Sequence, residues 1–493
     1  MTANSEFQKD FHDKNKLSTP ERTAISGPIF KSKVLGNIAG FPVFKITICF
    51  LLMISIPPFR MICSAMVKRG VSAISIYPKN TYYFQNTKGK PFMFVGDYTW
   101  ETFSGVNSDY VKMFESLKSR GLNLARVWLW WGCEELPANK SFPFNKKIHI
   151  EPYLREGPGL ANDGKPKYNL DKFNPAFFAR LTEFCKAADK RGINLDLMLM
   201  DAWMIKHDYL WRLNAYNRDN NVNNVDGDPQ NTKTGIDGRQ GFCSMGNPKV
   251  MEYQKAYIRK VVETVNRFDK IYFEIANENY YSEKWELALC DFIKKIELKM
   301  PNRHMTIRRD FPSHSYVVQT WNPVVVHKGI MGKRNLKVPL LFDTDWIINN
   351  NDDEVRKAAW SAVASGAHFS YMDDAMEFRK DSIIKDKRAA LHKQIDYIAK
   401  FMKLLKPWEM TPDDSLVKSG LSFAMANNKV LFAYLPYGGE VSLDLSAMKG
   451  EIIAKWYSPL NGEFGAAFQI AGKSETIFHA PDKNDWTLLI KSK

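Results

Sequence analysis

The sequence is poor in cysteine, and its cysteines do not form the close pairs that hold a zinc ion. Only six occur in 493 residues, and none has a second cysteine at the CxxC spacing. We therefore expect no metal site and no cofactor. The acidic loop 343–353 lacks the glycine and closing glutamate spacing of an EF-hand, the loop 223–231 is similarly unsupported as a calcium site, and we interpret both as solvated loops. The pattern leaves open whether any cysteines pair. The six are Cys49, Cys63, Cys133, Cys185, Cys243 and Cys290.

A cluster of positive charge and any nucleic-acid-binding motif are also missing. The formal net charge is +15, and residues 1–65 contribute eight Lys/Arg against four Asp/Glu. The other lysines and arginines are scattered and form no basic stripe. We interpret the charge as a solvated basic surface and expect no nucleic-acid partner.

Long hydrophobic runs are absent from the N-terminal region as well. The apolar run ITICFLLMISI at 46–56 has 11 residues, which is short for a bilayer span but suits the core of a signal peptide. The polar stretch 1–30 is longer than a usual signal-peptide start, so the start codon is assigned too early or the stretch is a cytoplasmic tail. A buried strand is the other interpretation of the run. We expect residues 1–65 to be a polar tail plus a signal or anchor segment. The protein is then secreted or periplasmic, or anchored in the membrane through 46–56.

From residue 74 onward, eight short apolar runs alternate with helical stretches. They lie at 92–97, 123–130, 194–201, 270–277, 304–310, 324–329, 339–345 and 367–373. Near-continuous apolar strands are typical of a parallel sheet buried on both faces, and eight of them with intervening helices favour a closed barrel. We predict a (β/α)8 TIM barrel over residues 74–408, with a hairpin around QNTKGK at its start.

Helix boundaries and the C-terminal strands complete the predicted organisation. Stretches 108–121 and 174–192 each end in a basic residue followed by Gly, and 247–267 begins with Asn and Pro, which are typical helix ends and starts. Beyond Lys406-Pro407-Trp408 the strands are short and separated by turns. This pattern predicts a small antiparallel β-sandwich over residues 415–493.

Polar residues at the strand ends carry the functional prediction, because the active site of such a barrel lies at the C-terminal ends of its strands. The fourth strand ends in Asn277-Glu278 and the seventh in Asp343-Thr344-Asp345. Carboxyl groups on these two strands would face each other across the barrel mouth. Cleavage of a glycosidic bond needs such a pair, one as acid/base and one as nucleophile or water activator.

The segment RFDKIYFEIANEN (267–279) strongly resembles the fourth-strand signature of clan A glycoside hydrolases. TKGKPFMFVGDYTWETF resembles the first strand of the apiosidase-like barrel family, and GLNLARVWLW the second strand of the clan. WYSPLNGEF and KNDWTLLIK resemble a small sandwich named for collagen binding, so the resemblance covers about residues 75–493. It implies a glycoside hydrolase that cleaves O-glycosidic bonds of a polysaccharide or its side chains. Glu278 would be the acid/base, Asn277 would contact a sugar 2-hydroxyl, and Arg126 would support the nucleophile.

The second carboxyl departs from the clan, which usually has Glu at the end of the seventh strand. This chain offers Asp343 and Asp345, and their spacing of two lets both point inward. Asp is one methylene shorter, so the carboxyl withdraws by about 1.5 Å if the backbone is unchanged. Three interpretations of Asp in place of Glu stay open. The shorter side chain is compensated elsewhere, the enzyme inverts the configuration, or the activity is lost. We favour an Asp nucleophile and leave open which Asp it is.

Other strand ends offer substrate contacts, since sugars combine hydroxyl groups with an apolar C–H face. For each Trp on its own, packing in the core explains the residue at least as well. The further candidates are Asp97, Trp100, Trp130, Trp131, Asp201, Trp203, His327, Trp346 and Asp373.

Two other interpretations stay open. The missing strand-seven Glu fits a catalytically inactive barrel that only binds glycan. The C-terminal sandwich fits an adhesion module for matrix protein or a brace for the barrel, and neither follows from a fold resemblance alone. We expect a monomer whose partner is a carbohydrate.

Overall fold

The computed structural model describes residues 74–98, 100–136, 147–231, 241–279, 282–312, 322–343, 351–372, 389–471 and 474–492. The chain divides into two units, Met1–Ala65 and Met66–Lys493, and all described residues belong to the second. The predicted signal or anchor segment at 46–56 lies outside the described residues. In the described ranges, no helix is both long enough and apolar enough to cross a membrane.

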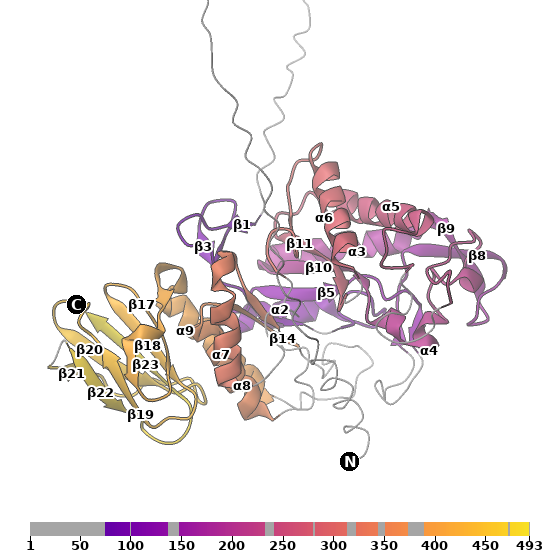
Figure 1. Cartoon of the computed structure of the whole chain (residues 1–493). Helices are drawn as coiled ribbons and strands as arrows, with labels where there is room; N and C mark the ends of the chain where they lie inside the picture. Colours follow the sequence, from indigo (N-terminus) through magenta and orange to yellow (C-terminus); the bar gives the residue numbers. More distant parts are fainter. Residues whose placement is uncertain are drawn as a thin grey trace, which may run out of the picture. The chain divides into compact units, whose positions relative to one another are not determined.

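A curled parallel sheet forms the centre of the larger part of this unit (Figure 1). Within the described ranges its order is β12-β11-β10-β5-β4-β14-β13, so the last strand in sequence pairs with the first. This curled parallel sheet, with helices between its strands and with β12 and β13 at its edges in the described ranges, has the arrangement of a TIM barrel, and the predicted fold is confirmed. The strands are β4 (Val95–Tyr98), β5 (Leu124–Trp128), β10 (Asn194–Asp201), β11 (Ile271–Asn277), β12 (Met305–Thr306), β13 (Leu341–Asp343) and β14 (His368–Met372).

One of the eight predicted strands is wrong. Residues 324–329 belong to helix α7 (Pro323–Gly332) instead of a sixth strand. The side chain of Asn322 accepts hydrogen bonds from the backbone N–H groups of Val324 and Val325, and Pro323 occupies the first helical turn. These start signals outweigh the strand preference of the three consecutive valines. Residues 313–321, which precede α7, lie outside the described residues.

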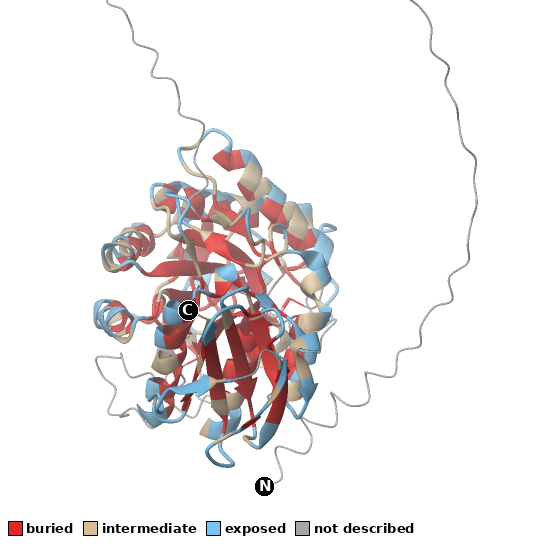
Figure 2. Cartoon of the chain, turned by 90° about the vertical axis from the view of Figure 1, so that its left-hand side faces the viewer, coloured by how far each residue is buried: buried red, intermediate tan, exposed pale blue. Residues whose placement is uncertain are grey.

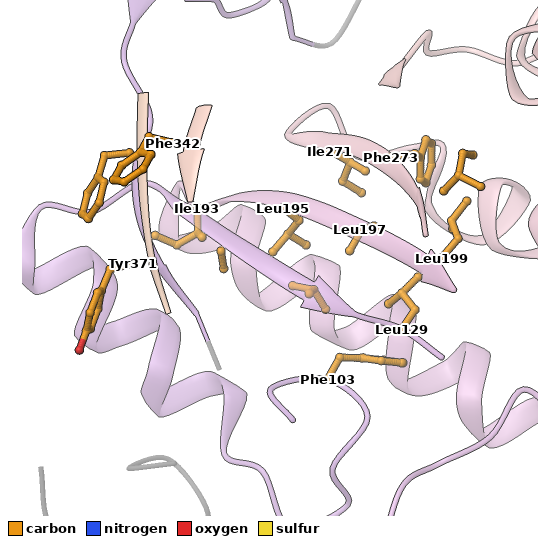
Figure 3. Close-up of a cluster of buried hydrophobic side chains, with 14 of the residues drawn as sticks. Phe103, Leu129, Ile193, Leu195, Leu197, Leu199, Ile271, Phe273, Phe342 and Tyr371 are labelled. Atoms are coloured by element: carbon orange, nitrogen blue, oxygen red, sulfur yellow. The ribbon is translucent and has the colours of Figure 1, made fainter. Parts of the chain in front are cut away.

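Helices cover the outer face of the sheet, and their predicted ends agree with the structure. The stretches ending in Gly121 and Gly192 are helices whose C-cap glycines have φ of 82° and 76°. Figure 3 shows Leu195, Leu197 and Leu199 of β10, which belong to the main hydrophobic core on one side of the sheet. The helices are α2 (Tyr110–Arg120), α3 (Pro175–Arg191), α5 (Pro248–Val265), α6 (Glu283–Glu297), α8 (Asp352–Ala364) and α9 (Ala389–Leu405), with short α4 (Asp208–Trp211) and η2 (Met204–Lys206).

The N-terminal end of the barrel is closed by apolar side chains. The predicted hairpin forms a small sheet of β1 (Ser75–Ile76), β2 (Phe84–Gln85) and β3 (Pro91–Phe92). Phe84 packs with Phe94 and Phe311 in a buried cluster that also contains Leu124 and Tyr272. The opposite end, where the strands terminate, is the end at which the active sites of such barrels lie. An insertion after β5 adds the pairs β6 (Glu135–Leu136) with β7 (Lys147–Ile148) and β8 (Tyr153–Leu160) with β9 (Pro166–Phe173).

The C-terminal region consists of two antiparallel sheets with their own buried core (Figure 2). One sheet has the order β15-β17-β18-β23-β20-β21 and the other β16-β19-β22. Phe432, Tyr434 and Leu489 of the larger sheet belong to the same core cluster as the barrel helices, so this sheet packs directly on the barrel. The strands are β15 (Thr411–Pro412), β16 (Val417–Ser419), β17 (Phe423–Ala426), β18 (Val430–Leu435), β19 (Glu440–Asp444), β20 (Ile452–Tyr457), β21 (Phe468–Ile470), β22 (Glu475–His479) and β23 (Trp486–Ser492).

Candidate active site

A buried arginine joins three barrel strands. Arg126 of β5 is only 2% exposed and donates to both carboxylate oxygens of Glu274 at 2.9 and 3.0 Å. It also donates to Asp343 Oδ2 and to Asn277 Oδ1, each at 3.0 Å. The planar guanidinium thus fixes side chains of β11 and β13 with charge-assisted hydrogen bonds. Of the residues predicted for the site, Arg126, Asn277 and Asp343 are brought together.

Several buried carboxyl groups lie around this arginine. Asp196 Oδ2 lies 4.0 Å from Arg126 Nε, so the guanidinium faces three carboxyl groups: Asp196, Glu274 and Asp343. All three carboxyl side chains are at most 4% exposed. Burying charged groups is expensive. Buried ionisable groups that three strands bring together around one cation are frequent at functional sites.

The first strand contributes a tyrosine in place of the expected aspartate. Tyr98 Oη donates to Asp343 Oδ1 at 2.8 Å, so both oxygens of Asp343 accept a donor. Asp97, predicted to contact substrate, instead points to the helix layer and pairs with Arg120 of α2 at 2.6 Å. Neighbouring residues of a strand face opposite sides, so only one of Asp97 and Tyr98 can reach the mouth.

The end of β11 carries Glu278 in an unusual backbone conformation. Its φ of 44° lies in the left-handed region, which costs a non-glycine residue about 1 kcal/mol and is frequent at active sites. Lys206 Nζ lies 2.8 Å from Glu278 Oε2, and the two side chains are 16% and 11% exposed. Glu278 is therefore the more accessible carboxyl of the site, in contact with a cation.

Asp201, at the end of β10, is hydrogen-bonded to Asn277 and so belongs to the same cluster of side chains. Its Oδ1 accepts the backbone N–H of Trp203 at 2.9 Å and Asn277 Nδ2 at 3.3 Å. Burial, and secondly the charge of Glu278, raise the pKa of Asp201 to about 7. The hydrogen bonds from Asn277 and Trp203, together with Lys206, act in the opposite direction. Asp201 can therefore hold a proton near neutral pH.

Aromatic side chains form the wall beside these polar groups. The Trp128 ring lies under the Arg126 guanidinium at 4.7 Å and stacks with Trp131, whose centroid is 6.2 Å away. Trp100 and Trp203 are half-buried against the same cluster. Flat rings beside carboxyl and amide groups suit a ligand with an apolar face and a polar rim.

Two predicted contacts lie away from the mouth. Trp130 donates to Glu151 at 2.6 Å and packs among the rings of the main core, 5.2 Å from Tyr257. His327 lies in α7, where Nε2 is 3.0 Å from Asp414 and the ring stacks on Phe423 at 4.1 Å. Both of these His327 partners belong to the C-terminal region, so it contributes to that interface. Asp345, Trp346 and Asp373 lie outside the described residues.

Sequence reasoning missed Tyr98, Glu274 and Lys206. A signal existed for Glu274, because a charge inside an otherwise apolar strand must find a buried partner. Arg126 is such a charge on β5, which is separated from β11 by one strand, β10. Lys206 follows β10 in a short 3-10 helix, and no sequence pattern indicates that it reaches Glu278.

Comparisons with known proteins agree with this architecture. Residues 412–491 match the family model described as "Putative collagen-binding domain of a collagenase", and residues 143–301 match "Domain of unknown function (DUF6298)". A search among curated proteins found no match.

Solved structures with the same fold include glycoside hydrolases. One described as "Glycoside hydrolase" has a TM-score of 0.57 at 15% identity, covering 86% of this chain and 97% of that chain. A glycoside hydrolase family 5 protein from Bacteroides vulgatus ATCC 8482 also has a TM-score of 0.57, at 16% identity and with 85% and 93% covered. At such identities the similarity establishes the shared fold.

Proposed function

We propose that the protein is a glycoside hydrolase of clan A, related to the apiosidase-like barrels, that cleaves O-glycosidic bonds of a polysaccharide or its side chains. One observation carries the proposal. Arg126 binds Glu274 and Asn277 of β11 and Asp343 at the end of β13, Asn277 directly precedes Glu278, and tryptophans pack beside this group. Buried ionisable groups gathered in this way are frequent at functional sites.

Glu278 is the acid/base in this proposal. It follows Asn277 at the end of β11, is partly accessible, and can reach a leaving-group oxygen at the mouth. Asn277 is held through both ends of its amide, by Arg126 and by Asp201, so its orientation is fixed before substrate binds. Such pre-organisation places the reacting groups without further ordering.

Asp343 is the second carboxyl that the geometry supports best. Arg126 and Tyr98 each donate to one of its oxygens, and both donors stabilise negative charge on it. A carboxylate of this kind can attack an anomeric carbon or activate a water molecule. Asp345 stays the alternative. A carboxyl separation of roughly 5–5.5 Å from Glu278 gives retention of configuration, and roughly 6.5–9.5 Å gives inversion.

The test is a panel of polysaccharides and aryl glycosides, with turnover and binding measured in parallel for the wild type and Asp343→Asn. We expect hydrolysis of at least one glycan by the wild type and a loss of at least about 100-fold in the variant, with binding retained. Binding without turnover by the wild type would instead identify a catalytically inactive glycan-binding barrel.

We also propose that the protein is exported, and that residues 46–56 act as the signal or anchor segment. Fractionation of cells that express the full chain tests this. We expect the protein outside the cytoplasm, and deletion of 46–56 should retain it inside. Export of the deleted form would contradict the assignment.

A further inference from the structure

We propose that His149 is a positioning residue of the candidate active site, because its imidazole ring closes a stack of flat groups that supports the Arg126 guanidinium. The order of the stack is Arg126, Trp128, Trp131 and His149. This inference rests on the proposed function, since Arg126 holds the groups to which catalysis is assigned, but its first test needs no substrate.

The four groups of the stack follow one another closely. The guanidinium carbon of Arg126 lies 4.7 Å from the centroid of a Trp128 ring. The Trp128 and Trp131 rings are 6.2 Å apart with 24° between their planes. The Trp131 and His149 rings are 4.9 Å apart and nearly parallel, at 7°. All four residues are at most 3% exposed, and in a close-packed interior one ring cannot tilt far without moving the next.

Backbone hydrogen bonds hold His149 between the segments that follow the first two barrel strands. Its N–H donates at 2.6 Å to the carbonyl of Glu134, which lies between β5 and β6. The N–H of the next residue, Ile150, donates at 2.9 Å to the carbonyl of Ser104, which lies between β4 and α2. The backbone around His149 is thus tied to both segments, and its ring lies against Trp131, which the segment after β5 carries.

A carboxyl group places the edge of the same imidazole ring. His149 Nε2 lies 4.0 Å from Glu101 Oε1, and the two side chains are 0% and 4% exposed. Glu101 belongs to the segment between β4 and α2. The ring is therefore held at its edge by Glu101 and on its face by Trp131, which gives it one orientation.

The stack supplies what the hydrogen bonds of Arg126 lack. Those bonds join the guanidinium to side chains of β11 and β13 and lie near its own plane, so they do not support its face. Trp128, at 4.7 Å, is nearer to that group than the ring of Tyr98, at 5.8 Å. A tilt of the guanidinium would displace the groups of both strands at once, and a misplacement of about 1 Å can cost about 100-fold in rate. His149 therefore acts through Arg126.

Two variants separate stacking from the other contacts of His149. His149→Leu and His149→Phe both remove the polar atoms near Glu101, but only Phe keeps a flat ring against Trp131. In protein labelled with 5-fluorotryptophan, fluorine NMR signals are assigned with Trp128→Phe and Trp131→Phe. We expect the Trp128 signal to move in His149→Leu, although Trp131 lies between the two residues, and to stay near its wild-type position in His149→Phe. An unmoved Trp128 signal in His149→Leu, or equal shifts in both variants, would overturn the proposal.

His327 supplies the matched control. Its ring also stacks on an aromatic ring, that of Phe423, at 4.1 Å and 9°, but in the interface with the C-terminal region. His327→Leu should leave the Trp128 signal in place. A signal that moves as far in His327→Leu as in His149→Leu would show that the loss of any stacked imidazole gives the effect, and would also overturn the proposal. Thermal unfolding checks that each variant is folded. If His149→Leu does not fold, His149→Met, whose flexible side chain fills the space without a flat ring, takes its place.

Activity on an aryl glycoside that the wild type hydrolyses gives the second readout. We expect kcat to fall by about 10-fold or more in His149→Leu with KM little changed, because the stack positions catalytic groups and does not bind sugar. His149→Phe should recover most of this loss, and His327→Leu should show none. An unchanged kcat in His149→Leu overturns the inference. A wild type without turnover, together with the expected movement of the Trp128 signal, refutes only the proposed function.

Discussion

Among the residues that the structure describes, two arginines are almost completely buried, and their surroundings differ. Arg356 of α8 donates to Asp485, whose side chain is 0% exposed, at 2.7 Å, and to the exposed Asp353 at 2.6 Å. Arg126 faces three buried carboxyl groups, which come from β10, β11 and β13. The first arginine has one buried carboxyl partner and joins the barrel to the C-terminal sheet. The second is surrounded by carboxyl groups of three strands, and its partner Asn277 directly precedes Glu278. The comparison teaches that several buried carboxyl groups around one cation, more than burial of a cation, distinguish a functional site from a structural one.

The interface around Arg356 is otherwise apolar and aromatic. Trp360 stacks on Tyr434 at 6.0 Å, and Tyr434 Oη donates to Asp485 at 3.2 Å. Because the C-terminal sheet shares a continuous core with α8 and α9, it braces the barrel in this structure.

The largest expected effect is on stability at this interface. Arg356→Met leaves Asp485 buried without its cation, and we expect a loss of about 3–5 kcal/mol in the free energy of unfolding, measured with urea. Activity per folded molecule should not change. The double variant Arg356→Met/Asp485→Leu should regain most of the loss, and a double variant as unstable as the single one would contradict this account of the pair.

Arg126→Lys should lower activity more than stability, which is the reverse of the effect expected for Arg356→Met. Lysine keeps the charge but cannot hold Glu274, Asn277 and Asp343 at once, so the catalytic groups lose their fixed positions. We expect kcat/KM to fall by about 10²–10³-fold, or about 3–4 kcal/mol in transition-state free energy. Arg356→Lys is the control, with kcat/KM unchanged. Equal activity losses in the two variants would remove the distinction between the two arginines.

Tyr98→Phe should have a smaller effect, because it removes one of the two donors to Asp343. We expect a fall in kcat/KM of about 10-fold, corresponding to about 1.5 kcal/mol for a hydrogen bond to a charged group. Tyr83→Phe, which removes a buried hydroxyl outside the mouth, serves as the control. A larger loss in the control than in Tyr98→Phe would exclude the proposed role of Tyr98.

The smallest effect concerns the second polar contact of the interface. Burial lowers the pKa of His327, although Asp414 acts in the opposite direction. Below pH about 6.5 the unfolded chain then binds a proton that the folded protein binds less readily, so stability falls as pH decreases. We expect the wild type to lose up to about 1 kcal/mol between pH 7 and 5 relative to His327→Gln, by urea unfolding. A gain over this range would mean that the Asp414 contact dominates.

Much of the fold could be predicted because it depends on local signals. The glycines at 121 and 192 end their helices as expected, and the apolar runs at 194–201 and 270–277 coincide with β10 and β11 to within a residue. The exception, 324–329, shows that a capping Asn and an N-terminal Pro outweigh a run of valines.

The site could be predicted only in part, because its contacts join residues far apart in sequence. The strand-end motif indicates Asn277 and Glu278, yet the pairing of Arg126 with Glu274 spans 148 positions. Alternation alone cannot decide between Asp97 and Tyr98, since every residue of β4 is buried. The interface partners Arg356 and Asp485, 129 positions apart, carry no motif at all.

The most direct test of the central claim compares Glu278→Gln with the wild type on two substrates of the same sugar, one with a poor leaving group and one with an activated aryl group. If Glu278 donates the proton, kcat/KM for the substrate with the poor leaving group falls by about 10²–10⁴-fold. The activated aryl group leaves without protonation, so kcat/KM for the aryl glycoside falls far less. Matching thermal unfolding of the two proteins confirms that the variant is folded. Equal losses on both substrates, or no loss on either, would contradict the assignment of Glu278 as the acid/base.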